Sequence, residues 1–213
     1  VEKVMFADGT SLTSTQILNL LTNTAPQIIS NPVSFSGDED TRITLDLKSN
    51  VTDADGDFLF LSNVKLVDVT QGTLMSLDTG EVEFTPSANF NGEVLLNYTV
   101  SDGTAELSGQ AVINVAAVND APETLIPLEN QSTDENQPLT YVLPTDAFID
   151  IDGDNLSYTA TLLDGSPLPS WLSFNDKSQT FSGTPSFDDA GVVEVNVVAT
   201  DSGGAVATKL FRI

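Results

Sequence analysis

The sequence predicts an all-β protein made of two tandem antiparallel β-sandwich domains, preceded by a short strand and helix. Three observations lead to this prediction. Val, Leu, Ile and Phe occur in short runs interrupted by Gly, Pro, Asn and Asp, which is typical of strands and turns. A set of landmarks recurs about one domain length along the chain, and each copy contains a cluster of aspartates. The 213 residues are enough for two domains, each with its own core.

The repeat consists of the same residue types in the same order. Ala25-Pro26 recurs as Ala121-Pro122, and the cluster Asp53-Ala-Asp-Gly-Asp57 recurs as Asp150-Ile-Asp-Gly-Asp154. Further landmarks in the first copy are Thr85-Pro86, Gly92 and Asp102, and their counterparts are Thr184-Pro185, Gly191 and Asp201. The shared order predicts one duplicated unit, with domain 1 at residues 25–118 and domain 2 at residues 119–213.

Between the landmarks, apolar residues alternate with polar ones, as on half-buried strands. In domain 1 the alternating residues are Ile43, Leu45 and Leu47, then Val94, Leu96, Tyr98 and Val100, then Ala111, Ile113 and Val115. In domain 2 they are Leu139, Tyr141 and Leu143, then Leu156, Tyr158 and Ala160, then Val193, Val195, Val197 and Ala199, and finally Ala205 to Phe211. Turn residues separate these runs at the spacing of a sandwich of about seven strands.

Residues 1–24 belong to neither repeat. Val4 to Phe6 predict a short strand and Asp8-Gly9 a turn. Thr13 or Ser14 could then N-cap a short helix. Its apolar residues are Ile17, Leu18, Leu20 and Leu21. We expect this stretch to be the tail of a preceding domain or a cap.

The composition excludes several classes of function. Asp and Glu number 31 against seven Lys and Arg, a formal net charge of -24, so nucleic acid and anionic membrane surfaces are poor partners and bound cations are expected. The apolar strand pattern argues against disorder. The absence of Cys rules out disulfides, and the absence of His rules out a Ser-His-Asp triad and disfavours zinc or copper. No apolar run is long enough to predict a membrane span.

The two Asp-x-Asp-Gly-Asp clusters point to calcium. Calcium takes about six to eight oxygen ligands, and each cluster supplies three carboxylates around a Gly that permits a turn. An EF-hand is excluded, because Val64 and Thr161 stand where a bidentate Glu is required. The alternative is that these aspartates only cap turns. Finding the cluster at equivalent positions in both repeats favours the calcium-binding hypothesis. The remaining oxygen ligands would come from elsewhere in the chain.

From residue 25 onward the chain resembles the cadherin-like repeats of giant bacterial surface proteins. The motifs in domain 1 are Asp53-Ala-Asp-Gly-Asp57, Phe84-Thr-Pro86, Asn89-Phe-Asn-Gly92, Val100-Ser-Asp-Gly103 and Val118-Asn-Asp-Ala-Pro122. Domain 2 resembles the dystroglycan-type subgroup through Leu168-Pro-Ser-Trp-Leu-Ser-Phe174 and Phe181-Ser-Gly-Thr-Pro185, and residues 2–10 resemble the strand that closes the β-roll of RTX proteins. This combination implies an RTX adhesin, exported by type I secretion to the bacterial cell surface, with a role in cell adhesion and biofilm formation.

The resemblance also implies the calcium ligands. In cadherins, calcium lies where consecutive domains meet, held by a Glu of the upstream domain, the linker, and an Asp-x-Asp and a later Asp of the downstream domain. The implied central site consists of Glu39, Asn119, Asp120, Asp150, Asp152 and Asp201, with Asp154 as a further candidate. The implied site at the start of domain 1 consists of Asn23, Asp53, Asp55, Asp57 and Asp102. Thr24 stands where the linker Asp is expected, so this site should bind calcium more weakly or with fewer ions.

These observations predict a calcium-rigidified spacer that is not an enzyme, because no acid pair stands apart from the metal ligands as a hydrolytic pair would. Its expected partners are neighbouring repeats of the same long chain, and we expect a monomer. A second hypothesis is that domain 2 captures a polysaccharide or peptide on a target cell, and a third is homophilic pairing. Trp171 could stack on a sugar, but its apolar neighbours favour a core or strand-end position.

Overall fold

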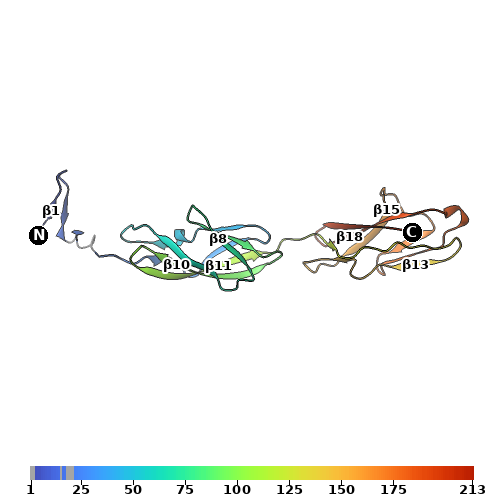
Figure 1. The fold of residues 1–213 in the computed structure, drawn as a ribbon, viewed down its shortest axis with the longest axis horizontal. Coiled ribbons are helices and arrows are strands. Elements are labelled where there is room, and N and C mark those ends of the chain that lie inside the picture. Colours follow the sequence, from blue (N-terminus) through green and yellow to red (C-terminus); the bar gives the residue numbers. More distant parts are fainter. Residues whose placement is uncertain (1–2, 15, 18–21) are drawn as a thin grey trace. The chain divides into compact units, whose positions relative to one another are not determined.

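The computed structural model describes residues 3–14, 16–17 and 22–213 (Figure 1). Strands make up most of the regular structure of these residues, which confirms the all-β class. The chain divides into two compact units, Val1–Val118 and Asn119–Ile213, which we call unit 1 and unit 2. No helix among the described residues is long and apolar enough to cross a membrane.

Unit 1 contains a four-stranded and a three-stranded sheet. The larger has the order β4 (Val33–Asp38), β11 (Glu106–Ala116), β10 (Gly92–Ser101) and β7 (Phe60–Leu66). The smaller has the order β5 (Ile43–Leu45), β9 (Val82–Pro86) and β8 (Gly72–Ser76). Two short strands, β3 (Gln27–Ile28) and β6 (Val51–Thr52), pair with each other, and the 3-10 turn η1 (Lys48–Asn50) precedes β6.

One strand pair differs from the predicted antiparallel arrangement. β10 and β11 form a long antiparallel hairpin, but β4 runs parallel to β11, with Val33 opposite Ala111 and Asp38 opposite Ala116. The antiparallel prediction is therefore wrong for this pair. A tight turn imposes antiparallel pairing on consecutive strands, whereas β4 and β11 are separated by most of the domain and are free of that constraint.

The core of unit 1 lies between its two sheets. All ten residues of the predicted alternating pattern are buried, including Leu47, which lies beyond the end of β5 but is fully inaccessible. Phe84 from β9, which the alternating pattern did not include, is also fully buried. The alternation therefore predicted which side chains are buried better than it predicted where the strands end.

Unit 2 is built in a similar way from two three-stranded sheets. One has the order β15 (Ser157–Leu162), β18 (Glu194–Thr200) and β19 (Val206–Arg212). The other has the order β13 (Leu139–Val142), β17 (Thr180–Gly183) and β16 (Leu172–Asn175). The short strands β12 (Glu123–Thr124) and β14 (Phe148–Ile149) pair with each other, and η2 (Phe187–Asp189) is a 3-10 turn.

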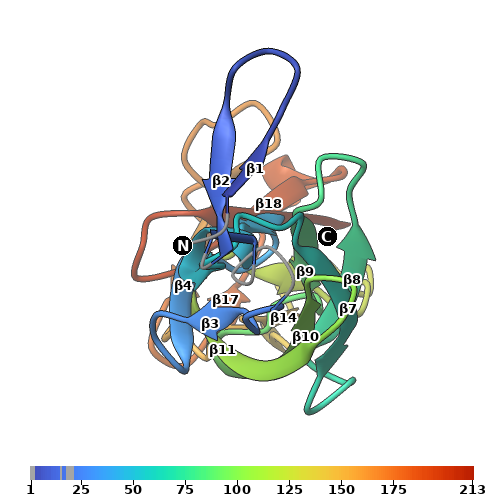
Figure 2. The same ribbon diagram turned by 90° about the vertical axis from the view of Figure 1, so that its left-hand side faces the viewer.

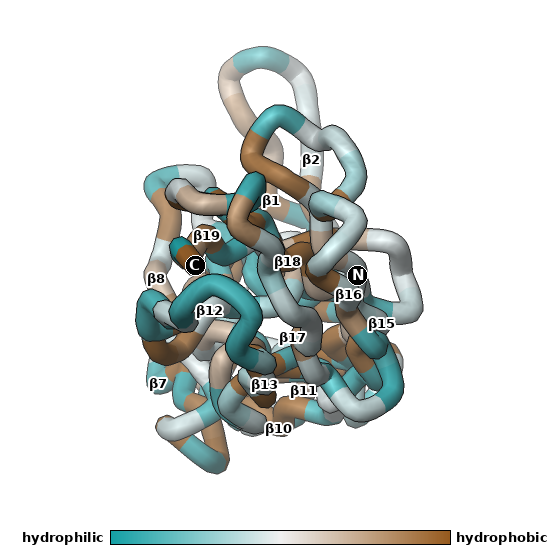
Figure 3. Tube along the Cα trace, turned by 90° about the vertical axis from the view of Figure 1, so that its right-hand side faces the viewer, coloured by the Kyte–Doolittle hydropathy of each residue, from teal (hydrophilic) through white to brown (hydrophobic). Residues whose placement is uncertain are grey.

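Aromatic rings fill much of the core of unit 2. Phe181 and Phe211 are buried, with ring centroids 5.2 Å apart in an edge-to-face arrangement, and Tyr141 stacks beside them. Trp171 is partly buried and packs against this core, as predicted. Hydrophobic and hydrophilic segments interleave along the Cα trace (Figure 3), as expected for strands with one buried face.

The N-terminal stretch forms a hairpin of β1 (Lys3–Met5) and β2 (Ser11–Thr13), seen at the top of Figure 2. The predicted strand and turn are present, with Gly9 at a φ of 85°, but β2 was not predicted. Thr13 and Gln16 exchange side chain to backbone hydrogen bonds, as in a helix capping box. Leu18, Leu20 and Leu21 of the predicted helix lie outside the described residues.

Phe181→Ala should lower the free energy of unfolding of unit 2 by about 3–5 kcal/mol, because it removes a fully buried ring and leaves a cavity. The measurement is denaturant unfolding of the whole chain followed by the fluorescence of Trp171, the single tryptophan. Phe187→Ala is the matched control, since Phe187 is 74% exposed and should change the free energy by less than about 0.5 kcal/mol. Equal effects of the two substitutions would contradict the described core.

Candidate metal centres

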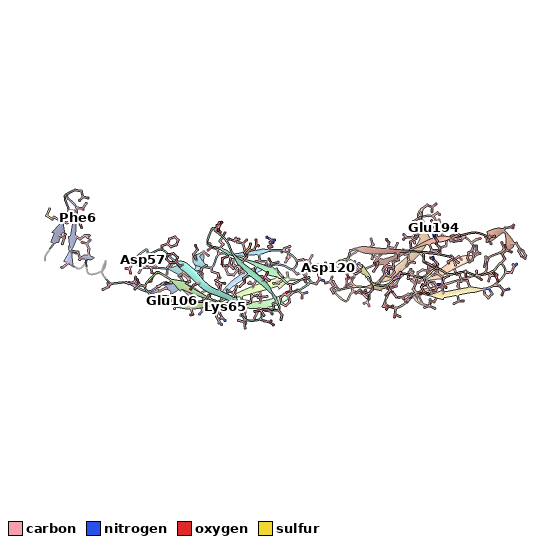
Figure 4. All side chains as sticks on the ribbon, in the orientation of Figure 1. Phe6, Asp57, Lys65, Glu106, Asp120 and Glu194 are labelled. Carbon is pink, nitrogen blue, oxygen red and sulfur yellow. The ribbon has the colours of Figure 1, made fainter. Side chains whose placement is uncertain are left out.

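In unit 1, chain segments far apart in sequence bring the predicted ligands to one end of the sandwich. The acidic loop Asp53–Asp57 follows β6, and Asp102 follows β10. Asn23 precedes β3, which pairs with β6. Figure 4 shows Asp57 and Glu106 at the same end of unit 1, as expected because Glu106 lies opposite Ser101 in the β10–β11 hairpin.

Hydrogen bonds connect these three segments. The Asn23 side chain donates from Nδ2 to Asp102 Oδ2 at 2.8 Å, and the backbone N–H of Thr24 donates to Asp55 Oδ2 at 2.6 Å. Asp53 Oδ1 accepts from the backbone N–H groups of Asp55 and Asp57 at 2.9 and 3.2 Å. The segment before β3 is therefore bound to both acidic elements of the candidate site.

The equivalent residues of unit 2 make the same bonds. Asn119 Nδ2 donates to Asp201 Oδ2 at 3.0 Å, and the backbone N–H of Asp120 donates to Asp152 Oδ2 at 2.8 Å. Asp150 Oδ1 accepts from the backbone N–H groups of Asp152 and Asp154 at 3.1 and 3.0 Å. Six of the predicted ligands thus come together within unit 2. The duplication seen in the sequence extends to individual hydrogen bonds.

The local conformation of both loops follows from their composition. Gly56 and Gly153 each have a φ of 78°, a left-handed conformation that costs glycine little. The turn predicted at each glycine is confirmed. The first aspartate of each loop accepts two backbone N–H groups, so the turn-capping alternative describes one of its two oxygens correctly.

The second oxygen of that aspartate has no such partner. Asp53 Oδ2 and Asp150 Oδ2 are both buried and accept no hydrogen bond from the described residues. A buried carboxylate oxygen without a partner is unfavourable, because burial removes its hydration without replacing it. The same unpaired oxygen at equivalent positions of both units is what turn capping alone leaves unexplained, and it suits a cation that accepts hard oxygen ligands.

The two clusters differ in how the third aspartate is held. The carboxylates of Asp53, Asp55 and Asp57 have oxygens that all lie within 4.8 Å of one another. In unit 2, Asp154 Oδ2 accepts a short hydrogen bond from the Ser202 hydroxyl. Gly103 stands at the equivalent position of unit 1 and has no side chain to make this bond. Nothing in the sequence of one repeat marks Ser202, which was not predicted as part of the site.

Hydrogen bonding lowers the pKa of the later aspartate of each site. The pKa of Asp201 lies below its ordinary value of 3.8, chiefly because the Asn119 side chain donates to it. The pKa of Asp102 is also lowered, chiefly by the backbone N–H of Ala105 and then by the Asn23 side chain. Both groups are therefore charged at neutral pH and available to bind a cation.

Glu39 lies at the other end of unit 1, directly after β4. It is only 2% exposed, an unusual location for a carboxylate. Its Oε1 accepts from the backbone N–H of Val118 at 2.8 Å, and its Oε2 accepts from Asn91 Nδ2 at 3.3 Å. Asn91 was not predicted to contact it, although it lies within one of the motifs quoted above. Glu39 therefore holds the last residue of unit 1.

Family comparisons classify the two units separately. Residues 22–116 match the family described as "Cadherin-like domain", and residues 121–213 match the family described as "Putative Ig domain". Unit 1 is thus similar to cadherin-like domains and unit 2 to Ig-like domains. Cadherin-like domains are typically extracellular and non-enzymatic, and they usually bind calcium. No curated protein sequence matches this chain significantly.

Solved structures with similar folds include cadherins. Human Protocadherin-24 EC1-2 is 16% identical over 90% of this chain and 97% of that chain, with a TM-score of 0.55. Human CDH23 EC21-23 is 16% identical over 89% of this chain and 68% of that chain, with a TM-score of 0.56. At these identities the likeness concerns the fold alone. An endo-fucoidan hydrolase of glycoside hydrolase family 107 is 24% identical, with a TM-score of 0.39, and this chain spans 28% of its length.

Asn119→Ala should raise the pKa of Asp201 toward 3.8 in metal-free protein and leave the pKa of Asp102 low, because only Asp201 loses a donor. Carboxyl carbon NMR titration in a chelator measures both. A folded-state pKa below the unfolded value adds stability above the unfolded pKa, and this is lost as pH falls through the folded pKa. Asn119→Ala should therefore weaken the acid dependence of unfolding. Asn23→Ala is the reciprocal control, and a shift of Asp201 in that variant would contradict the assignment.

Proposed function

We propose that this chain is a calcium-rigidified module of a large bacterial surface adhesin, which extends or presents ligand-binding regions for cell adhesion and biofilm formation. The observation that carries the proposal is the buried, unpaired carboxylate oxygen at the same position of both acidic loops. The proposed site at the start of unit 1 comprises Asn23, Asp53, Asp55, Asp57 and Asp102. The proposed central site comprises Glu39, Asn119, Asp120, Asp150, Asp152 and Asp201, with Asp154 as a further ligand.

Calcium suits these groups better than other common metals. The donors are carboxylate and amide oxygens, the chain has no Cys or His, and calcium tolerates the irregular geometry of loops. Asp53 and Asp150 would each present their unpaired oxygen to the ion. Asn119 and Asn23 would lie beside the later aspartate of each site, to which they already donate. The ion would add positive charge where several carboxylates meet.

Glu39 is proposed as the ligand that unit 1 contributes to the central site. Its carboxylate is bound to the backbone N–H of Val118, which is followed in the chain by Asn119 and Asp120. An ion that shares Glu39 with these linker residues would restrict the backbone between Val118 and Asp120. A linker of so few residues has little other means of fixing the orientation of two domains.

Electrostatic repulsion between carboxylates is the reason that calcium would change the rigidity of the module. Without calcium, carboxylates at each site repel one another, and the surplus of acidic over basic residues adds to this repulsion. Bound ions remove it and favour one arrangement of loop and linker. An ion at about 100 times its dissociation constant stabilises the form that binds it by roughly 2.7 kcal/mol. The stabilisation from two occupied sites would exceed that of a typical surface salt bridge.

The setting of the module is proposed from the resemblance of the sequence to RTX adhesins. Export by type I secretion would place the chain on the bacterial cell surface, where calcium is available and where a protein without Cys needs a substitute for disulfides. Its partners would be neighbouring repeats of the same long chain, and the module itself would be a monomer.

Removing calcium should lower the melting temperature of the chain and increase its flexibility. The measurement is differential scanning calorimetry together with small-angle X-ray scattering, in calcium and in a chelator. Magnesium serves as the control cation, because its demand for near-octahedral geometry makes it a poor substitute at such loops. An unchanged melting temperature and scattering profile in the chelator would refute the proposed role.

Asp152→Ala should loosen the linkage between the units more than it unfolds unit 2, because Asp152 binds the backbone N–H of Asp120 and is exposed. We expect a broader scattering profile and weaker calcium binding by calorimetry, with a change in unfolding free energy of about 1 kcal/mol. Asp176→Ala removes the same charge from an exposed turn of unit 2 and is the control. Equal scattering changes in the two variants would count against the central site.

A further inference from the structure

A groove on unit 1 lies outside the candidate metal centres. It is about 540 Å³ in volume and lies between the first half of β7 and the β8–β9 hairpin. Figure 2 shows β7 and β8 on the same side of unit 1. β7 and β8 are the edge strands of their sheets, so the groove lies where the two sheets of the sandwich leave their edges open.

Two exposed phenyl rings line this groove. Phe58 is 71% exposed and Phe60 is 51% exposed, whereas Phe84 of the same unit is fully buried. Their ring centroids are 4.9 Å apart, with the planes inclined by 66°. Because neither ring is buried, both leave apolar surface in contact with water. Exposed aromatic rings grouped at a groove are typical of a binding surface. The ring edges and faces offer an apolar platform for a ligand.

Lys48 supplies a cation at the same place. Its Nζ lies 6.0 Å from the centroid of the Phe58 ring and close to Gly80 in the β8–β9 turn, where a larger residue would collide with it. No carboxylate of the described residues forms an ion pair with Lys48, despite the large excess of acidic residues. The ammonium therefore keeps donors available to a ligand.

Hydrogen-bonding groups of both kinds complete the lining. Asp78 and Glu81 provide carboxylate acceptors, and Glu81 already accepts from the Thr79 hydroxyl at 2.8 Å. The Ser62 hydroxyl is buried and has no hydrogen-bond partner within the described residues. The groove thus combines an apolar platform with several separated donors and acceptors, as small-molecule sites do.

We propose that this groove binds a neutral oligosaccharide. A pyranose ring presents C–H groups on one face, which pack against aromatic rings, and hydroxyls around its rim, which both donate to carboxylates and accept from an ammonium. The two acids of the lining and the net charge of -24 disfavour an anionic ligand, and the Lys48 ammonium beside the Phe58 ring disfavours a cationic group at that ring. A neutral ligand with many hydroxyls can donate hydrogen bonds to the carboxylates of the lining and accept them from the ammonium.

An added peptide strand suits the groove less well. Pairing with the free edge of β7 would need a regular run of backbone groups. The register of β7 against β10 shifts between Asn97 and Thr99, and Asn63 on β7 has a left-handed φ of 53°. Such an irregularity bends the strand and interrupts a regular edge, which protects it from strand addition.

The location differs from the ligand-binding region expected from the sequence, which was domain 2. A hollow of about 450 Å³ on unit 2 is lined by Leu, Val and Pro with two acids, and contains neither an aromatic ring nor a cation. It therefore lacks the stacking platform and the donor that unit 1 combines. The proposal concerns ligand capture and is independent of the proposed calcium role.

The test is affinity electrophoresis of the whole chain in calcium buffer. The gels contain one of four neutral polysaccharides, a β-1,3-glucan, a dextran, a galactomannan or a xyloglucan, with alginate and chitosan as anionic and cationic comparisons. We expect retardation by at least one neutral polysaccharide, and weakening by about threefold to tenfold in Phe58→Ala and in Phe60→Ala. Phe187→Ala, which removes an equally exposed ring from unit 2, should not change the migration. Melting curves of each variant verify that the fold is retained.

The possible outcomes test the class of ligand and the location of the binding site separately. Retardation by no neutral polysaccharide, or only by alginate or chitosan, overturns the neutral ligand. Equal loss in Phe58→Ala and Phe187→Ala overturns the location. A peptide-array hit that protects the β7 amides from hydrogen exchange would assign the groove to strand addition instead. Because the calcium role is tested by melting and scattering, either proposal can fail while the other stands.

Discussion

Asp53 and Asp150 each use their two carboxylate oxygens differently. One oxygen accepts the backbone N–H groups that shape the acidic loop, while the other is buried without a hydrogen-bond partner among the described residues. The backbone of the loop therefore provides hydrogen bonds to only one of the two oxygens of this carboxylate. The neighbouring bonds, from Thr24 to Asp55 and from Asp120 to Asp152, then bring the preceding segment to the same place. A cation at this position would complete an arrangement that the backbone leaves unfinished.

The sandwich provides this arrangement by separating apolar from charged residues along each strand. Buried side chains such as Phe84 and Phe181 occupy the middle of each unit, while the acidic residues lie where strands end. The long β10–β11 hairpin keeps Asp102 and Glu39 at opposite ends of unit 1, because β4 runs alongside the far end of β11. Unit 1 therefore carries residues of the two proposed sites at its opposite ends.

Repetition of the fold has not made the two units identical. Ser202 binds Asp154 in unit 2, whereas Gly103 leaves Asp57 without that neighbour in unit 1. The paired rings of Phe58 and Phe60 likewise belong to unit 1 alone, because Asn155 and Ser157 stand at the equivalent positions of the other repeat. The hydrogen bonds of the acidic loop recur at the end of each sandwich, whereas neighbouring positions differ. The same fold therefore allows the proposed metal sites to differ and the proposed ligand groove to belong to one unit.

The strand alternation, the turns at Gly56 and Gly153, and the residue types of the candidate sites could all be predicted from the sequence, because period and turn chemistry are local properties. The tertiary structure added the hydrogen bond from Asn23 to Asp102, 79 positions apart, two residues that the family resemblance had already assigned to one site. It also decided that β4 runs parallel to β11, and that the buried Glu39 accepts the N–H of Val118. Such partners depend on how distant segments pack, and a single sequence carries no local signal for that choice.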